Sequence, residues 1–114
     1  MGNSISKNRT TILNCANWGM ETFFNNFLAV AEEEGLKNNA IILDFLDQID
    51  QKMQGRGFVM VELTDYFADQ PDKLPLKLFY DLALKTIVKI KQQDFGEFKS
   101  GYFALLDDFS KKIL

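Results

Sequence analysis

Hydrophobic residues recur along most of this chain at intervals of three and four positions, the spacing that places side chains on one face of a helix. The first stripe lies in residues 12–30 and consists of Ile12, Ala16, Met20, Phe23, Phe27 and Val30. Gly19 interrupts this stripe, so it marks either a kink or a division into two helices. Gly35 follows the stripe in the position after a helix end that glycine commonly occupies. We therefore expect residues 12–34 to be helical.

The same spacing predicts three more helices. One begins near Asn39, a good N-cap residue, and runs to Met53. Another begins between Asp72 and Pro75, since proline is tolerated in a first turn, and the last spans roughly residues 100–114. The predicted core residues are Ile41, Ile42, Phe45, Leu46, Ile49 and Met53 in the first, Leu76, Phe79, Leu82, Ala83, Ile87 and Ile90 in the second, and Phe103, Leu105, Leu106, Phe109 and Ile113 in the third.

The stretch "GRGFVMVEL" is ambiguous. Its aromatic and β-branched residues at 58–61 would suit a short strand. No second strand is visible to pair with it, so we expect a helix over residues 59–70 that Pro71 stops. The pattern as a whole predicts an all-α protein, a compact single-domain bundle of five or six helices over residues 1–114. Residues 1–9 are expected to be a flexible N-terminus.

Composition narrows the class of protein. A length of 114 residues suits one domain, and 46% apolar residues exclude a disordered chain. The longest apolar runs fall far short of the ~18 residues that a membrane span needs, and no secretory signal peptide is recognisable. A single cysteine, Cys15, cannot form an internal disulfide, which suits a reducing compartment. We expect a cytoplasmic protein.

Charge is distributed unevenly along the chain. The net charge is −3 and the pI is about 4.9, which disfavours direct binding to nucleic acid. Residues 20–72 carry eleven acidic side chains against three basic ones, whereas residues 73–114 carry eight lysines and five acids. An acidic block of this kind usually indicates a partner or improves solubility, and does not determine a fold.

Few residues could support catalysis. The chain has no histidine, which removes nucleophilic sites and zinc sites that depend on it. Cys15 adjoins the first apolar stripe and is expected to be a small buried hydrophobe. Asp44, Asp47 and Asp50 would fan across about 120° of one helix and cannot converge on one ion by themselves. We expect no cofactor, no metal and no enzymatic activity; an enzyme that uses two carboxylates stays as a remote alternative.

The N-terminus carries one short motif. "MGNSIS" fits the N-myristoylation pattern, with Gly2 as the acyl acceptor and Ser6 in the required position. One acyl chain gives only weak membrane binding, and Lys7 and Arg9 are a poor second signal. The motif has meaning only in a eukaryote or its virus. It supports an alternative function, an N-myristoylated eukaryotic or viral protein-interaction adaptor.

The segment "VELTDYFADQ" at 61–70 combines acids with an aromatic pair. On the predicted helix, Glu62, Asp65 and Asp69 share an arc about 60° wide. Phe67 belongs to the opposite, buried face, and Tyr66 lies on the boundary. Tyrosine at such a boundary is frequent in the hot spots of protein interfaces, because it offers an apolar ring and a hydroxyl. Either this is an ordinary surface helix, or it is a binding face.

The preceding helix adds Asp44, Asp47 and Asp50, so two neighbouring helices would present acids to a basic partner. A small, acidic, helical chain with "LTDYFADQPDKLP" and no catalytic residues resembles the bacterial immunity proteins of contact-dependent growth inhibition and colicin systems. The resemblance implies a protein that binds and blocks a cognate toxin, often a basic nuclease. Asp65, Tyr66 and Pro71 loosely match a toxin-contacting segment of colicin nuclease immunity proteins, with Phe67 where a second tyrosine would stand. The candidate partner-binding residues are Glu62, Asp65, Tyr66, Asp69, Asp44, Asp47 and Asp50.

Overall fold

The computed structural model describes residues 3–36, 38–56, 60–67, 74–94 and 96–113, and these form helices packed on a small sheet. The elements in chain order are β1 (Asn3–Lys7), β2 (Thr10–Cys15), α1 (Asn17–Glu33), α2 (Ala40–Arg56), β3 (Met60–Glu62), α3 (Leu63–Tyr66), α4 (Leu74–Lys91), the 3-10 turn η1 (Gly96–Phe98) and α5 (Lys99–Ile113). The predicted all-α class is wrong, because β1, β2 and β3 form a mixed three-stranded sheet.

The sheet places β1 in the middle, antiparallel to β2 and parallel to β3. Ile5 pairs with Leu13 on one side and Val61 on the other, so three buried side chains form one row across the sheet. The strand β1 is the pairing partner of Met60–Glu62 that was not visible in the sequence. The predicted helix over residues 59–70 is therefore wrong in its first part, where residues 60–62 are β3.

Residues 3–15 form a β-hairpin, where we expected a flexible N-terminus over residues 1–9 followed by a helix from Ile12. Asn8 and Arg9 connect β1 to β2 with φ of 53° and 68°, the positive values that a two-residue type I′ turn requires. The register shifts between Ile5 and Ser6, and this bulge allows consecutive residues of β2, Ile12 and Leu13, to be buried together.

The remaining helices agree with their predicted positions. Gly35 ends α1 with φ of 76°, and the Leu36 N–H donates to the Ala31 carbonyl at 2.9 Å. The Asn39 side chain caps α2 by accepting from the Ile42 N–H at 3.1 Å. The core residues predicted for α4 are all buried. Helix α5 begins at Lys99, beside the expected start at residue 100.

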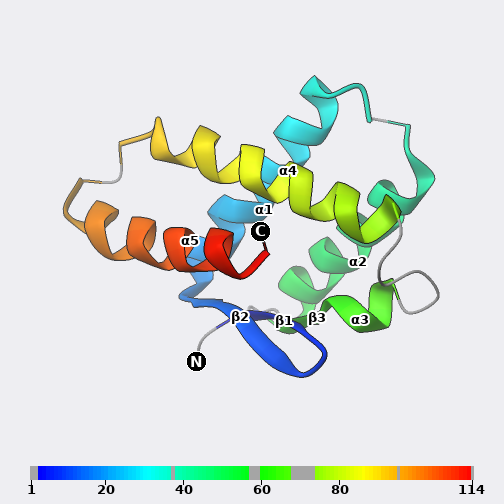
Figure 1. The fold of residues 1–114 in the computed structure, drawn as a ribbon, viewed down its shortest axis with the longest axis horizontal. Helices are drawn as coiled ribbons and strands as arrows, with labels where there is room; N and C mark the ends of the chain where they lie inside the picture. The colour runs from blue at the N-terminus through cyan, green and yellow to red at the C-terminus, as the bar shows by residue number, and fades with distance from the viewer. Residues whose placement is uncertain (1–2, 37, 57–59, 68–73, 95, 114) are drawn as a thin grey trace.

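The helices α1, α4 and α5 pack together above the sheet, with α4 and α5 forming an antiparallel pair and α2 and α3 at one end of the molecule (Figure 1). Aromatic rings fill the space between them. Phe27 of α1, Phe45 of α2 and Phe79 of α4 meet with ring centroids 5.3 to 6.4 Å apart, within the range of favourable aromatic pairs. Phe45 thereby joins α2 to the core.

Candidate functional site

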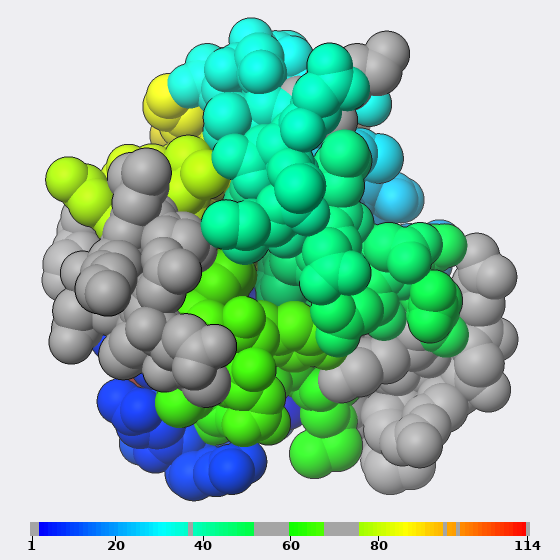
Figure 2. Space-filling model, turned by 90° about the vertical axis from the view of Figure 1, so that its right-hand side faces the viewer, coloured from blue at the N-terminus to red at the C-terminus, as the bar shows by residue number. Residues whose placement is uncertain are grey.

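A cavity of about 390 Å³ lies between α2 and α3 at the end of the molecule that faces the viewer in Figure 2. It is partly open to solvent. Its lining residues are Ala40, Ile41, Asp44, Phe45, Gln48, Asp65, Tyr66 and Phe67. The cavity brings together Asp44, Asp65 and Tyr66, which were singled out from two separate segments of the sequence.

The aromatic wall of the cavity is built by a short run of chain that leaves the sheet. Leu63 is fully buried and anchors the start of α3, which directs the next two aromatic residues toward α2. The Tyr66 ring meets Phe45 edge-on at a centroid distance of 5.1 Å, and the Phe67 ring lies 5.7 Å from Phe45. The predicted boundary position of Tyr66 is confirmed, since it is half-buried while Phe67 is buried.

Glu62 holds the hairpin turn and the start of α3 together. Its carboxylate accepts hydrogen bonds from the backbone N–H groups of Arg9 at 2.8 Å, Thr64 at 2.9 Å and Asn8 at 3.2 Å. Burial tends to raise the pKa of Glu62, but the backbone hydrogen bonds from Thr64 and Arg9 outweigh it and lower the pKa to about 2. The carboxylate is therefore ionised at neutral pH and engaged within the chain.

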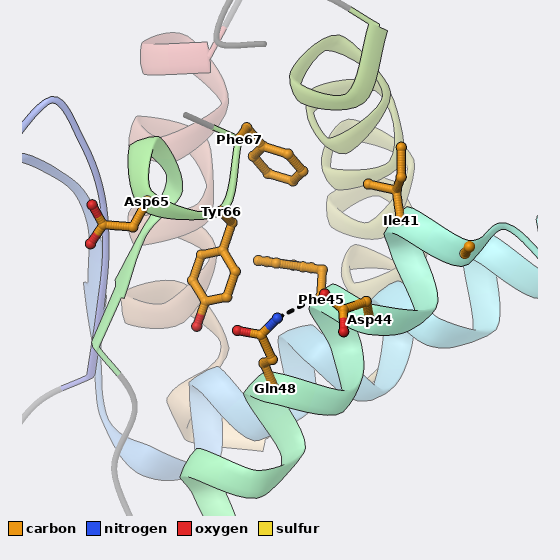
Figure 3. A pocket seen from close by; sticks show the side chains of 8 residues that line it. Ile41, Asp44, Phe45, Gln48, Asp65, Tyr66 and Phe67 are labelled. Carbon is orange, nitrogen blue, oxygen red and sulfur yellow. Dashed lines mark hydrogen bonds between the residues drawn. The ribbon is translucent and has the colours of Figure 1, made fainter. Parts of the chain in front are cut away.

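The other candidate acids differ in their surroundings. Asp65 is exposed and lies 3.9 Å from the Arg9 guanidinium, an ion pair between two exposed side chains. In Figure 3 its side chain points away from the cavity toward the hairpin, whereas Asp44 lies beside Gln48 across from Tyr66. The Gln48 amide donates to Asp44 Oδ2 at 2.8 Å.

Asp47 and Asp50 are exposed on α2 but do not line the cavity. Asp47 accepts a hydrogen bond of 3.0 Å from Gln51, in the same i to i+4 arrangement that joins Asp44 to Gln48. Asp69 and Gly2 lie outside the described residues. The structure thus gathers part of the predicted set at one cavity and leaves the rest of α2's acids on an adjacent surface.

Gln48 and Ile41 are among the cavity residues that the sequence did not identify as site residues. Gln48 was overlooked as an ordinary polar residue of α2. Ile41 was assigned to the core, yet it is 47% exposed and lines the cavity, while Ile42 is fully buried. Adjacent positions on a helix are about 100° apart, so Ile41 and Ile42 point in different directions, and of the two only Ile42 points into the core.

Reactive and metal-binding groups do not converge elsewhere in the described part of the chain. Cys15 is buried as predicted, and burial raises the pKa of its thiol to about 11, so little thiolate forms at neutral pH. No cluster of three or more Cys, Asp or Glu side chains is arranged to hold a metal ion among the described residues. None of the described helices has the length and apolar character needed to cross a membrane.

Comparisons with known proteins found no relatives: the chain matches no protein-family model, no curated protein and no solved structure.

Proposed function

We propose that this protein is a non-enzymatic, cytoplasmic immunity protein that binds a basic toxin, a nuclease domain, and occludes its active-site surface. The observation that carries the proposal is the cavity between α2 and α3. It is lined by an acidic residue of each helix, Asp44 and Asp65, and by the half-buried Tyr66; the Asp44 side chain lies across from the Tyr66 ring, while that of Asp65 points toward the hairpin (Figure 3). An aromatic anchor with acids around it is suited to a protein partner rich in Lys and Arg.

The contact surface in this proposal consists of the cavity and the adjoining acids of α2, Asp47 and Asp50. Both are exposed, so a partner can reach them. Glu62 is left out of the contact set, because its carboxylate already accepts three backbone hydrogen bonds within the chain. The toxin's phosphate-binding Lys and Arg would pair with the remaining acids, which would block access of nucleic acid to the toxin.

Sequencing the neighbouring reading frames for a toxin domain, followed by co-expression of this chain with that domain, tests this function. The unaltered chain should restore growth and form a complex that calorimetry detects. The double variant Asp44→Lys/Asp65→Lys should lose protection and bind at least about tenfold more weakly, since each reversal places a like charge opposite the partner's cations.

The matched control is Glu21→Lys/Glu97→Lys, which changes the net charge equally at exposed positions on α1 and η1, outside the cavity. This control should still protect. Unchanged affinity in the Asp44/Asp65 variant would remove this face from the interface. A toxin that the unaltered chain neither binds nor inhibits would remove the immunity function.

A further inference from the structure

The cavity is large enough to hold one side chain of a partner. At about 390 Å³ it is near the lower end of the range for small-ligand pockets, about 300 to 1,000 Å³. Phe45, Tyr66 and Phe67 present rings around it, with Phe45 between the other two (Figure 3). A flat or extended group could lie against these rings, whereas a whole helix could not enter.

The polar groups of the cavity set the charge of its occupant. Asp44 is exposed at the edge, and its Oδ2 is engaged by the neutral Gln48 amide. Its Oδ1 has no hydrogen-bond donor among the described residues, so it can accept from an incoming cation. Gln48 and Tyr66 also line the cavity, and they carry an amide oxygen and a hydroxyl group. These groups are hydrogen-bond acceptors for an N–H-rich occupant.

A guanidinium meets these conditions better than other charged groups. It is planar, so it stacks on an aromatic ring, and its five N–H donors can reach a carboxylate and an amide oxygen together. It is also less strongly hydrated than the lysine ammonium, so less free energy is lost when an aromatic cavity strips its water. A metal ion would require more oxygen ligands than the single carboxylate that faces the cavity.

We infer that the cavity between α2 and α3 receives one arginine side chain of the partner, with its guanidinium stacked on the aromatic wall and hydrogen-bonded to Asp44. This inference rests on the proposed function and specifies how the partner is held. Asp44 and Tyr66 form this arginine-binding site, which we call the seat. Asp65, whose side chain points toward the hairpin, contributes negative charge near the entrance and is not part of the seat.

A titration with N-acetyl-arginine methylamide, followed by ¹H–¹⁵N NMR, tests the seat without any toxin. We expect saturable shifts at the Gln48 side-chain amide and at the backbone amides of Asp44 and Tyr66, with a dissociation constant in the millimolar range. The citrulline analogue has nearly the same shape but no charge, and should bind at least about threefold more weakly because it forms no ion pair. Equal binding of the two probes, or shifts located away from the cavity, would overturn the inference.

A pair of matched variants locates the effect. Asp44→Asn should weaken arginine binding by about threefold, the range expected for an exposed ion pair. Asp47→Asn removes the same charge from the same helix, and from a residue with the same glutamine contact, but outside the cavity, so affinity should be unchanged. Equal losses in both variants would show a general charge effect and contradict the seat.

The ring is tested separately from the hydroxyl group. Tyr66→Phe should keep most of the affinity, while Tyr66→Leu should lower it by about two- to fivefold, as expected when a cation–π contact is removed. The test is independent of the toxin assay. If the chain binds arginine but no toxin, the seat is supported and the proposed function is contradicted. If it binds toxin but not arginine, the proposed function is supported and the seat is contradicted.

Discussion

At the scale of single residues, Glu62 is the side chain whose role changes most once its surroundings are known. It caps α3 through the Thr64 N–H and accepts both N–H groups of the Asn8–Arg9 turn. Thr64 adds to this connection, since its Oγ1 accepts from the Asn8 N–H at 2.9 Å. One carboxylate therefore fixes the hairpin turn to the segment that carries the aromatic wall of the cavity.

Replacing Glu62 with glutamine should lower stability in a pH-dependent way. The pKa of Glu62 falls from 4.5 to about 2 on folding, so the unfolded chain takes up the proton first as the pH falls. The stability that Glu62 contributes is complete above about pH 4.5 and is lost as the pH falls toward 2. At neutral pH the variant should lose about 1 kcal/mol of unfolding free energy, typical of a lost N-cap.

Urea unfolding at neutral pH and near pH 2 measures this difference. The difference in unfolding free energy between the unaltered chain and Glu62→Gln should become smaller at low pH. Glu97→Gln, which removes an exposed carboxylate from η1, should cost little at either pH. If this difference in unfolding free energy stays constant down to about pH 2, the ionised form of Glu62 is not what stabilises the fold.

At the scale of elements, the contact between α1 and α5 depends on a glycine. Gly19 lies in the first part of α1, where the Tyr102 hydroxyl of α5 donates to its carbonyl at 2.6 Å. A Cβ atom at position 19 would lie 2.9 Å from Tyr102 Cε1 and 3.3 Å from Cys15 Sγ. The glycine that looked like a kink or a break in the sequence is therefore a packing site for a ring.

Gly19→Ala should destabilise the protein by about 1 to 3 kcal/mol, the usual cost of overpacking, although alanine favours helices. The control is Gly101→Ala on α5, where an added Cβ meets nothing within 4 Å, so the better helix propensity should raise stability by about 0.5 kcal/mol. Thermal or urea unfolding measures both changes. A Gly19→Ala variant as stable as the unaltered chain would contradict the close packing of Tyr102.

Elements differ in how far the sequence alone could place them. Helix α4 was predictable because its buried residues repeat along one face, and that period is visible without any partner. The strand β3 was not, because its three residues contain one buried side chain, Val61, and its pairing partner β1 is distant in the sequence. Short strands are stabilised by their neighbours, so local patterns carry little information about them.

At the scale of the whole molecule, the described acidic side chains differ in whether a basic side chain lies beside them. Glu33 and Glu34 at the end of α1 form ion pairs with Lys89 and Lys85 of α4, which offsets their unfavourable position at a helix C-terminus. Asp107 of α5 likewise pairs with Lys91. Asp44 and Asp47 of α2 accept instead from neutral glutamine amides, and these bonds leave their negative charge uncompensated.

Association with the proposed basic partner should therefore be steered by the α2–α3 end of the molecule. We expect the association rate constant to fall about tenfold between about 0.1 M and 1 M salt, as the Debye length shortens from about 10 to about 3 Å. The Asp44→Lys/Asp65→Lys variant should associate about tenfold more slowly at low salt and converge with the unaltered chain at high salt.

Stopped-flow measurements give these rates, with Glu21→Lys/Glu97→Lys as the variant of equal net charge. If both double variants slow association equally, net charge and not its location steers the encounter. The face between α2 and α3 would then have no special part in recognition.

The sequence by itself determined the helices α2, α4 and α5, most of the apolar core, and the acidic character of the middle of the chain. These properties are local: they depend on periodicity, capping residues and charge, which each segment carries without its neighbours. Helical spacing also places Tyr66 at the boundary of the core. Glu62 shares a face with Asp65 and Asp69 only if residues 59–70 form one continuous helix, which they do not.

Only the tertiary structure decided that residues 60–62 pair with the N-terminal strand, which places Glu62 under the hairpin turn. It also brought Asp44 and Gln48 to the cavity wall opposite Tyr66 and left Asp47 outside. Pairing of strands and convergence of side chains from α2 and α3 depend on contacts between segments far apart in the chain. Their free energy comes from burying the Ile5–Leu13–Val61 row and from packing the Phe45 ring against Tyr66 and Phe67. Periodicity places Phe45 on a buried face, but it does not show which segments the ring contacts.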